Sequence, residues 1–301
     1  MAEPAIRTEG LVKTYGRNRG LAGLDLEVRT GEVYGFLGPN GAGKTTTIRL
    51  LLDLIRPTAG RARVLGLDPR ADGVALRRRL GYLAGDFLVN GRQTPRELLT
   101  YLGNLRGGVP RAAIDALAER LGLDTTRQIA GLSRGNRQKV GLVQAFMHAP
   151  ELLVLDEPTS GLDPLLQQEF VAMVREARAA GQTIFMSSHV MSEVQQTADR
   201  VGIIREGQLV AVEQVEQLRE RAVRRVEIHF EEPVAAAEFA GLPGVSELAV
   251  DGVVLRCRLD GRADALVKAA GRHTVLSLLS EEPDLEELFL TYYQVGDGRA
   301  G

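Results

Sequence analysis

The sequence predicts an α/β fold, in which a core with a mainly parallel sheet is followed by a small α+β domain. Residues 38–45 read Gly-Pro-Asn-Gly-Ala-Gly-Lys-Thr, which matches the phosphate-binding pattern GxxxxGK[ST]. This loop lies between an apolar strand, residues 33–37, and a helical stretch that begins at Lys44. Strands and helices then alternate as far as Glu213, where the pattern restarts on a smaller scale. These observations together predict a P-loop NTPase core.

The regular elements of the first domain, residues 1–213, follow from its apolar periodicity. Strands are expected at 5–8, 24–29, 33–38, 61–65, 80–83, 151–155, 182–187, 200–204 and 208–212, and helices at 44–54, 72–78, 95–106, 111–121, 136–148, 165–180 and 190–197. Such alternation gives a mainly parallel sheet with ligands at the carboxyl ends of its strands. Hairpin-like strands around 5–15 and 22–38 predict an antiparallel subdomain, and the stretch of about 86–148 predicts a helical subdomain.

The second domain begins after a linker helix at 214–221, within a linker of residues 214–223. Its expected elements are strand 224–230, helix 234–241, strands 245–250 and 253–259, helix 262–271, strand 273–280 and a closing helix at 284–293. This β-α-β-β-α-β order predicts a ferredoxin-like sandwich over 224–295, with a disordered tail at 296–301. The alternation of residues 253–259 places Cys257 on the apolar face, which predicts a buried structural thiol.

Composition excludes several classes of protein. The net charge of −2 among 301 residues argues against a protein that coats nucleic acid. No apolar run approaches the roughly 20 residues of a membrane helix, so any passage through a membrane belongs to another chain. The single cysteine rules out an internal disulfide.

Three motifs carry the chemistry. In the P-loop, backbone N–H groups surround a triphosphate, Lys44 reaches its β- and γ-phosphates, and the Thr45 hydroxyl can bind Mg²⁺. The apolar strand 152–155 ends in Asp156 and Glu157, whose side chains point in different directions because strand residues alternate. One acid can therefore hold Mg²⁺ through water while the other orients a second group. Ser133, at the start of a helix, is either an N-cap or part of an anion site.

The order of the motifs resembles the nucleotide-binding subunits of the ATP-binding cassette (ABC) transporter family. The matching motifs are Gly38 to Thr45, Leu132 to Asn136, Asp156-Glu157, Ser160 to Asp163, and His189. The resemblance covers residues 5–212 or so and implies the ABC-ATPase fold, ATP and Mg²⁺ as ligands, and ATP hydrolysis as the activity.

The resemblance also implies a role for each matching residue. Tyr15 would stack on adenine, against the alternative of a core tyrosine. Asp156 and Thr45 would hold Mg²⁺, Glu157 would act as general base on the attacking water, and His189 would contact the γ-phosphate, with a capping or core histidine as the alternative. Lys44 counts among the catalytic residues. The nucleotide contacts would be Tyr15, Gly38, Pro39, Asn40, Gly41, Ala42, Gly43, Lys44, Thr45, Thr46, Ser133, Gly135 and Asp163.

In this family, each ATP lies between the P-loop of one subunit and the signature of a second subunit. The resemblance therefore implies a homodimer, or a pair of ATPase subunits, in which Ser133 and Gly135 reach ATP on the partner. The subunits would work at the cytoplasmic face of a bacterial membrane, contacting it through a separate integral permease and binding no nucleic acid.

The exporter branch with ABC-2 type permeases, such as the daunorubicin pumps, has a similar signature and closing segment, here Leu132 to Asn136 and Pro283 to Tyr293. This implies efflux of a small hydrophobic drug or antibiotic, or of a lipid-like cargo. An importer ATPase and a soluble ABC ATPase outside transport are the alternatives. The signature and the closing segment favour the exporter over the importer, and the single P-loop and the short helical insertion argue against the soluble class.

Two positions depart from the family pattern. Arg134 replaces the first signature glycine, and either adds a cation near the phosphates or faces solvent. Gly85 stands where the family has a glutamine that touches Mg²⁺ and signals to the membrane subunit. The next residue, Asp86, either supplies an oxygen ligand in its place or is a solvated loop acid.

Overall fold

The computed structural model describes residues 3–16, 18–87, 89, 91–221 and 223–281. The chain divides into two compact units, residues 1–213 and 214–301. Within the described residues, no helix combines the length and the apolar character needed to cross a membrane.

A six-stranded sheet forms the centre of the first unit, in the order β5-β6-β7-β3-β8-β9. Its strands are β3 (Val33–Leu37), β5 (Leu80–Leu83), β6 (Leu152–Asp156), β7 (Thr183–Ser188), β8 (Arg200–Arg205) and β9 (Gln208–Gln214). The pairs from β5 through to β8 are parallel. Strands β3, β6 and β7 are buried along their whole length, as expected for parallel strands that are covered on both faces.

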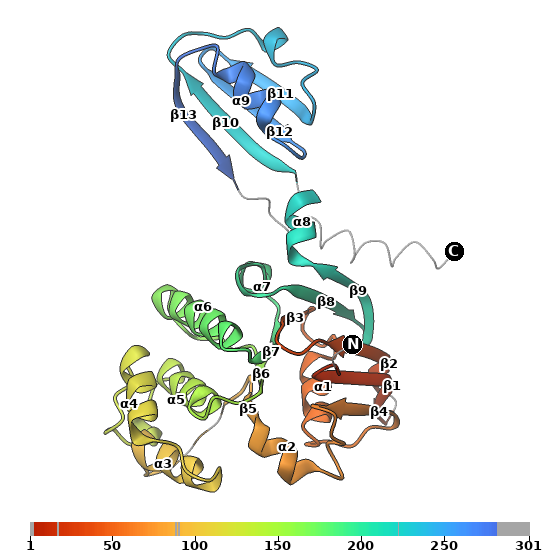
Figure 1. Ribbon diagram of the computed structural model, residues 1–301, viewed down its shortest axis with the longest axis vertical. Helices are drawn as coiled ribbons and strands as arrows, with labels where there is room; N and C mark the ends of the chain where they lie inside the picture. Colours follow the sequence, from red (N-terminus) through yellow and green to blue (C-terminus); the bar gives the residue numbers. More distant parts are fainter. Residues whose placement is uncertain (1–2, 17, 88, 90, 222, 282–301) are drawn as a thin grey trace. The chain divides into compact units, whose positions relative to one another are not determined.

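The predicted antiparallel subdomain is confirmed as a sheet of order β2-β1-β4, built from β1 (Ile6–Tyr15), β2 (Asn18–Val28) and β4 (Ala59–Val64). It shares one hydrophobic core with α1 (Lys44–Leu51) and one face of the six-stranded sheet. Leu152 and Val154 belong to this core, whereas Leu153 and Leu155 belong to the core on the opposite face. Strand alternation thus divides the first unit into two cores, and Figure 1 shows their elements on either side of the central sheet.

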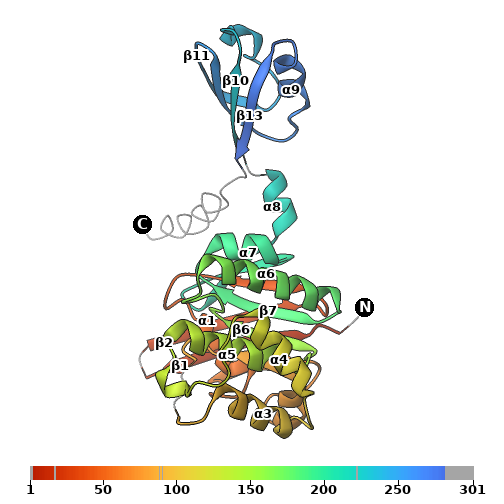
Figure 2. The ribbon, with the colours of Figure 1, turned by 90° about the vertical axis from the view of Figure 1, so that its left-hand side faces the viewer.

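Helices cover the second face of the sheet (Figures 1 and 2). They are α3 (Pro95–Leu105), α4 (Arg111–Arg120), α5 (Arg134–Phe146) and α6 (Pro164–Ala179), with α2 (Gly73–Arg79) and α7 (Met191–Thr197) at the ends of strands. Helix α3 begins with a capping box, in which the Thr94 hydroxyl accepts from the N–H of Glu97 and the Glu97 carboxylate accepts from the N–H of Thr94. A one-turn 3₁₀ helix, Ile129–Gly131, precedes α5.

The second unit holds α8 (Val215–Arg221) and a four-stranded antiparallel sheet of order β11-β12-β10-β13. The strands are β10 (Arg224–Phe230), β11 (Val245–Asp251), β12 (Val254–Leu259) and β13 (Val275–Glu281), and α9 (Asp264–Ala270) packs on the sheet. The first strand lies between the third and the fourth, which is the strand order of a ferredoxin-like fold. Cys257 is buried on the apolar face as predicted, and burial raises the pKa of its thiol.

One predicted helix of this unit is wrong. Residues 234–241 contain only a 3₁₀ turn, Ala236–Glu238. The segment lies between Pro233 and Gly241. The N–H of Val234 donates to the carbonyl oxygen of Gly252 and Ala235 is extended, so contacts with another part of the unit hold the start of the segment out of the helical conformation. The predicted closing helix at 284–293 and the tail at 296–301 lie outside the described residues.

Candidate functional site

The P-loop connects β3 to α1, as the sequence predicts. Gly43 has a φ of 113°, and a Cβ at this position would lie 2.8 Å from the carbonyl oxygen of Gly20. Only glycine satisfies both conditions, because other residues avoid this conformation and have no room for a side chain here. The tight turn leaves the first N–H groups of α1 without helical partners at the loop, which is the arrangement that binds anions.

A pocket of about 350 Å³ opens over this loop. It is lined by P-loop residues, by the two acids that end β6, and by residues from the loops that follow β5 and β7. The predicted residues on its wall are Pro39, Asn40, Gly41, Gly43, Lys44, Thr45, Thr46, Asp156, Glu157 and His189, joined by Gly85, Asp86, Arg134 and Ser160. The structure therefore brings together three motifs that are far apart in the sequence.

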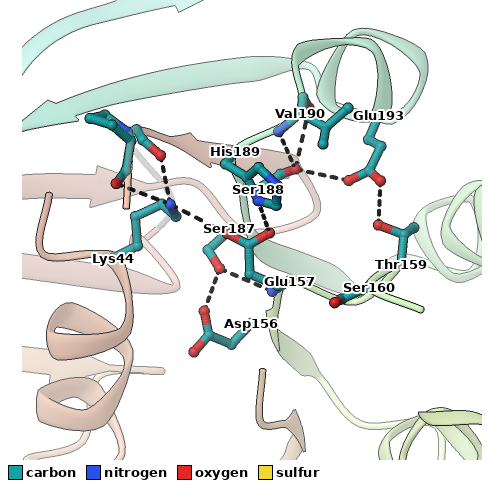
Figure 3. A network of polar contacts seen from close by, with 12 residues as sticks. Lys44, Asp156, Glu157, Thr159, Ser160, Ser187, Ser188, His189, Val190 and Glu193 are labelled. Atoms are coloured by element: carbon teal, nitrogen blue, oxygen red, sulfur yellow. Dashed lines mark hydrogen bonds and ion pairs between the residues drawn. The ribbon is translucent and has the colours of Figure 1, made fainter. Parts of the chain in front are cut away.

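Lys44, Glu157 and His189 form a continuous polar chain in this pocket (Figure 3). The Lys44 side chain is 6% exposed, and its Nζ donates to the carbonyl oxygen of Gly38 at 2.6 Å and lies 3.3 Å from Glu157 Oε1. The other carboxylate oxygen of Glu157, Oε2, lies 2.6 Å from Nδ1 of His189. The carboxylate is thus held between an ammonium group and an imidazole at the mouth of the P-loop.

Asp156 and Glu157 diverge as predicted, and a third residue fixes both. The Ser187 hydroxyl donates to Asp156 Oδ1 at 2.5 Å and accepts from the N–H of Glu157 at 3.2 Å. Asp156 is 2% exposed, yet it lines the pocket together with Thr45. A hydroxyl and a carboxylate are hard oxygen ligands, which suits Mg²⁺ that also binds phosphates and water. Within the described residues there is no group of three or more His, Cys, Asp or Glu side chains that could hold a metal ion.

Glu193 on α7 joins the loop after Glu157 to the loop that carries His189. Its carboxylate accepts from the hydroxyl of Thr159 and, at 2.8 Å, from the hydroxyl of Ser188, as Figure 3 shows. The Ser188 hydroxyl in turn accepts from the N–H of Val190 at 2.9 Å. The sequence analysis missed Glu193, because an acid in the first turn of a helix is ordinary and has no motif to mark it.

The signature, Leu132 to Asn136, has a different position relative to the pocket from that of the P-loop residues. Ser133 is the N-cap of α5, and its hydroxyl accepts from the N–H of Asn136 at 3.3 Å. Ser133 is exposed, and neither it nor Gly135 lines the pocket of its own chain. Arg134 does line this pocket, and its Nη2 donates to the hydroxyl of Ser160 at 3.2 Å. Asp163 caps α6 by accepting from the N–H groups of Leu165 and Leu166, away from the pocket wall.

Tyr15 is exposed at 47%, which excludes the alternative of a core tyrosine. The pocket wall includes Gly20, whose Cβ, if present, would lie 3.0 Å from the Tyr15 ring. The ring therefore lies beside the pocket, with one neighbour in Lys13, whose Nζ is 5.1 Å from the ring centroid. An exposed ring at the rim of a pocket can stack on a flat base.

The loop after β5 closes the pocket near Asp156. A Cβ at Gly85 would lie 3.4 Å from the Asp156 carboxylate, and Asp86 lines the same pocket. Sequence analysis did not single out Tyr82, which also lines it. Burial raises the pKa of Tyr82, and the negative charge of Asp156 raises it further.

Comparisons with known proteins agree with this geometry. A family model described as "ABC transporter" matches residues 21–160. The chain is 40% identical over 219 residues to the bacitracin transport ATP-binding protein BcrA of Bacillus licheniformis, and the match covers 72% of each chain. It is 36% identical to the daunorubicin resistance ATP-binding protein DrrA3 of Streptomyces coeruleorubidus, over 99% of this chain and 98% of that protein. A solved ATP-binding subunit of an ABC transporter superposes with a TM-score of 0.66 at 27% identity, over 71% of this chain and 92% of the other.

Proposed function

This chain belongs to the ABC transporter family as an ATP-binding subunit with ATPase activity, and we propose that it powers export of a small hydrophobic drug, antibiotic or lipid-like compound through a separate permease. The observation that carries the role of ATP hydrolysis in this proposal is the Glu157 carboxylate, held between Lys44 and His189 beside the P-loop. Two relatives named for bacitracin transport and daunorubicin resistance support export over import. The second of them matches along nearly the whole chain, including the second unit.

Hydrolysis follows from the charges in the pocket. The triphosphate of ATP competes with Glu157 for the ammonium group of Lys44, because both are anions within its reach. Release from Lys44 leaves the carboxylate free to accept a proton from the attacking water, as a general base does. His189, already against Glu157, is placed to contact the γ-phosphate. Thr45 and Asp156 would hold Mg²⁺, which neutralises charge that develops on the phosphates.

The active assembly we propose is a dimer, either of two copies or of this chain with a similar ATPase subunit. Ser133 and Gly135 lie outside the pocket formed by Lys44 and Glu157 of the same chain. The exposed Ser133 stands at the N-terminus of the 13-residue helix α5, which is suited to phosphate oxygens. These residues would reach an ATP molecule held by the P-loop of the second subunit. The dimer would dock on the cytoplasmic face of its permease.

The experiment that tests export places the chain in a drug-sensitive bacterium together with the permease that co-purifies with it. The wild-type chain should lower accumulation of a hydrophobic antibiotic such as an anthracycline. Lys44→Ala removes the ammonium group that binds the phosphates, so both ATP turnover and resistance should be lost. Equal drug accumulation with Lys44→Ala and with the wild-type chain would rule out an ATP-driven exporter.

A further inference from the structure

The backbone of Glu157 has an unusual conformation that its neighbours must maintain. Its φ is 48°, in the left-handed region that residues other than glycine avoid. On the amide side, the N–H of Glu157 donates to both the hydroxyl and the carbonyl oxygen of Ser187, each at 3.2 Å. These bonds fix one end of the residue. At the other end, the carbonyl oxygen of Glu157 accepts from the N–H of Ser160 at 3.2 Å, which closes the turn.

Gln138, on α5, adds a side-chain donor to the same turn. Its side chain is 4% exposed. Nε2 donates to the carbonyl oxygen of Pro158 at 2.9 Å and to the carbonyl oxygen of Glu157 at 3.5 Å. The amide nitrogen of glutamine carries two hydrogens and can serve both oxygens. Both hydrogen bonds of this buried amide nitrogen therefore go to the turn that follows β6.

The first turn of α5, which precedes Gln138, also lies against the loop 157–161. A Cβ at Gly135 would lie 2.8 Å from the carbonyl oxygen of Gly161, so the helix can approach only because this residue is glycine. Arg134 donates to Ser160 on the same side. Residues 134, 135 and 138 share one face of the helix, because side chains three or four positions apart are neighbours. Gln138 is therefore the buried end of a continuous contact with the loop that carries the general base.

We propose that Gln138 is a positioning residue for hydrolysis: its amide holds the Glu157–Pro158 carbonyls and thereby aims the Glu157 carboxylate at the attacking water. The inference rests on the proposed role of Glu157 as general base. Without the amide, the carbonyl oxygen of Pro158 loses its donor at 2.9 Å, and the carbonyl oxygen of Glu157 keeps only the N–H of Ser160, so the left-handed turn is held less firmly. The carboxylate then moves relative to the P-loop, and a displacement of about 1 Å lowers the rate of a positioned reaction by up to about a hundredfold.

The test compares Gln138→Met with Gln182→Met in the full-length chain. Methionine keeps the length of the side chain and removes the donor. Gln182 is a matched control, because its Nε2 donates to the carbonyl oxygen of another proline, Pro150, away from the pocket wall. Gln138→Met should lower kcat for ATP at least tenfold, leave the Kd for ATP within about twofold of wild type, and unfold at the same temperature as the control. Gln138→Glu, which replaces the donor by an acceptor at unchanged size, should have the same effect.

A double variant separates positioning from general damage. If Gln138 acts through Glu157, adding Gln138→Met to Glu157→Gln should not lower the residual single-turnover rate further. A further fall in that background, or a kcat for Gln138→Met within twofold of that for Gln182→Met, would overturn the inference. Wild-type turnover in Glu157→Gln alone would instead refute the assignment of the base. The two failures are therefore distinguishable.

Discussion

Replacing Glu157 by glutamine should have two opposite effects, a loss of turnover and a gain in ATP affinity. The loss follows from removal of the proposed general base, since general-base catalysis is worth about 10²- to 10⁴-fold in rate. The gain follows from Lys44, whose Nζ lies 3.3 Å from Glu157 Oε1. In the wild-type chain ATP must displace this carboxylate from Lys44, whereas the amide of the variant carries no charge to compete.

The size of the gain can be worked from that distance. Two unit charges 3.3 Å apart interact by about 5 kcal/mol at an effective dielectric constant of 20. Glu157 is partly exposed, with 21% of its side chain accessible, so solvent screening and the desolvation of both ions remove most of this value. A net contribution of about 1 kcal/mol remains, which corresponds to roughly fivefold tighter binding of ATP.

The assay measures ATP binding by equilibrium titration and phosphate release under single-turnover conditions. The matched control is Glu151→Gln, which removes a carboxylate bound to Arg79 by two 2.6 Å hydrogen bonds outside the pocket. The control should change neither quantity by more than about twofold, because its ion pair is at the surface. Glu157→Gln with unchanged turnover would refute the general base. Weaker ATP binding by this variant would refute the competition for Lys44.

Two further predictions concern the rim of the pocket. Tyr15→Ala should weaken ATP binding by about 1–3 kcal/mol without changing kcat at saturating ATP, because stacking on a base contributes to binding only. ATP binding is measured by titration, and the control variant is Tyr101→Ala, which removes another exposed tyrosine, on α3. Asp86→Ala should raise the Mg²⁺ concentration for half-maximal turnover and impair drug efflux, if Asp86 takes the place of the missing glutamine. Unchanged Mg²⁺ dependence and efflux would identify Asp86 as a solvated loop acid.

The local part of the site could be predicted because its chemistry is contiguous in the sequence. The P-loop needs only the residues between β3 and α1. The divergence of Asp156 from Glu157 is expected from strand alternation, but β6 ends at Asp156 and Glu157 turns out of the strand with a left-handed φ of 48°. The polar contacts among Lys44, Glu157 and His189 could not be predicted from contiguous sequence in this way. They depend on the strand order β6-β7-β3, which places Asp156 beside Ser187 and Leu37 beside Ser188. Strand order is decided by packing between distant segments, so periodicity alone does not reveal it.

Residues that act through the backbone were missed for a related reason. Gln138 and Glu193 contact carbonyls and hydroxyls, which every sequence supplies, and so nothing in their own neighbourhood marks them. The wrongly predicted helix at 234–241 shows the opposite error, in which a local pattern is present but does not decide the structure. Its three successive alanines favour a helix by propensity. The hydrogen bond from Val234 to Gly252 and the extended Ala235 override this preference, and the structure keeps a single 3₁₀ turn.

Helix α5 joins the two halves of the proposed mechanism. Its N-terminus presents Ser133 outside the pocket of its own chain, and its second turn places Gln138 against the loop of Glu157. Gln138 lies five positions after Ser133, a rise of about 7.5 Å with no flexible segment between them. In the proposed dimer, a phosphate of the partner's ATP that binds at Ser133 would therefore act on the same rigid helix that holds the Glu157 loop. Such an arrangement would give a physical reason for hydrolysis to wait until the dimer has closed, since on this proposal the Glu157 carboxylate is aimed through the helix that the second nucleotide contacts.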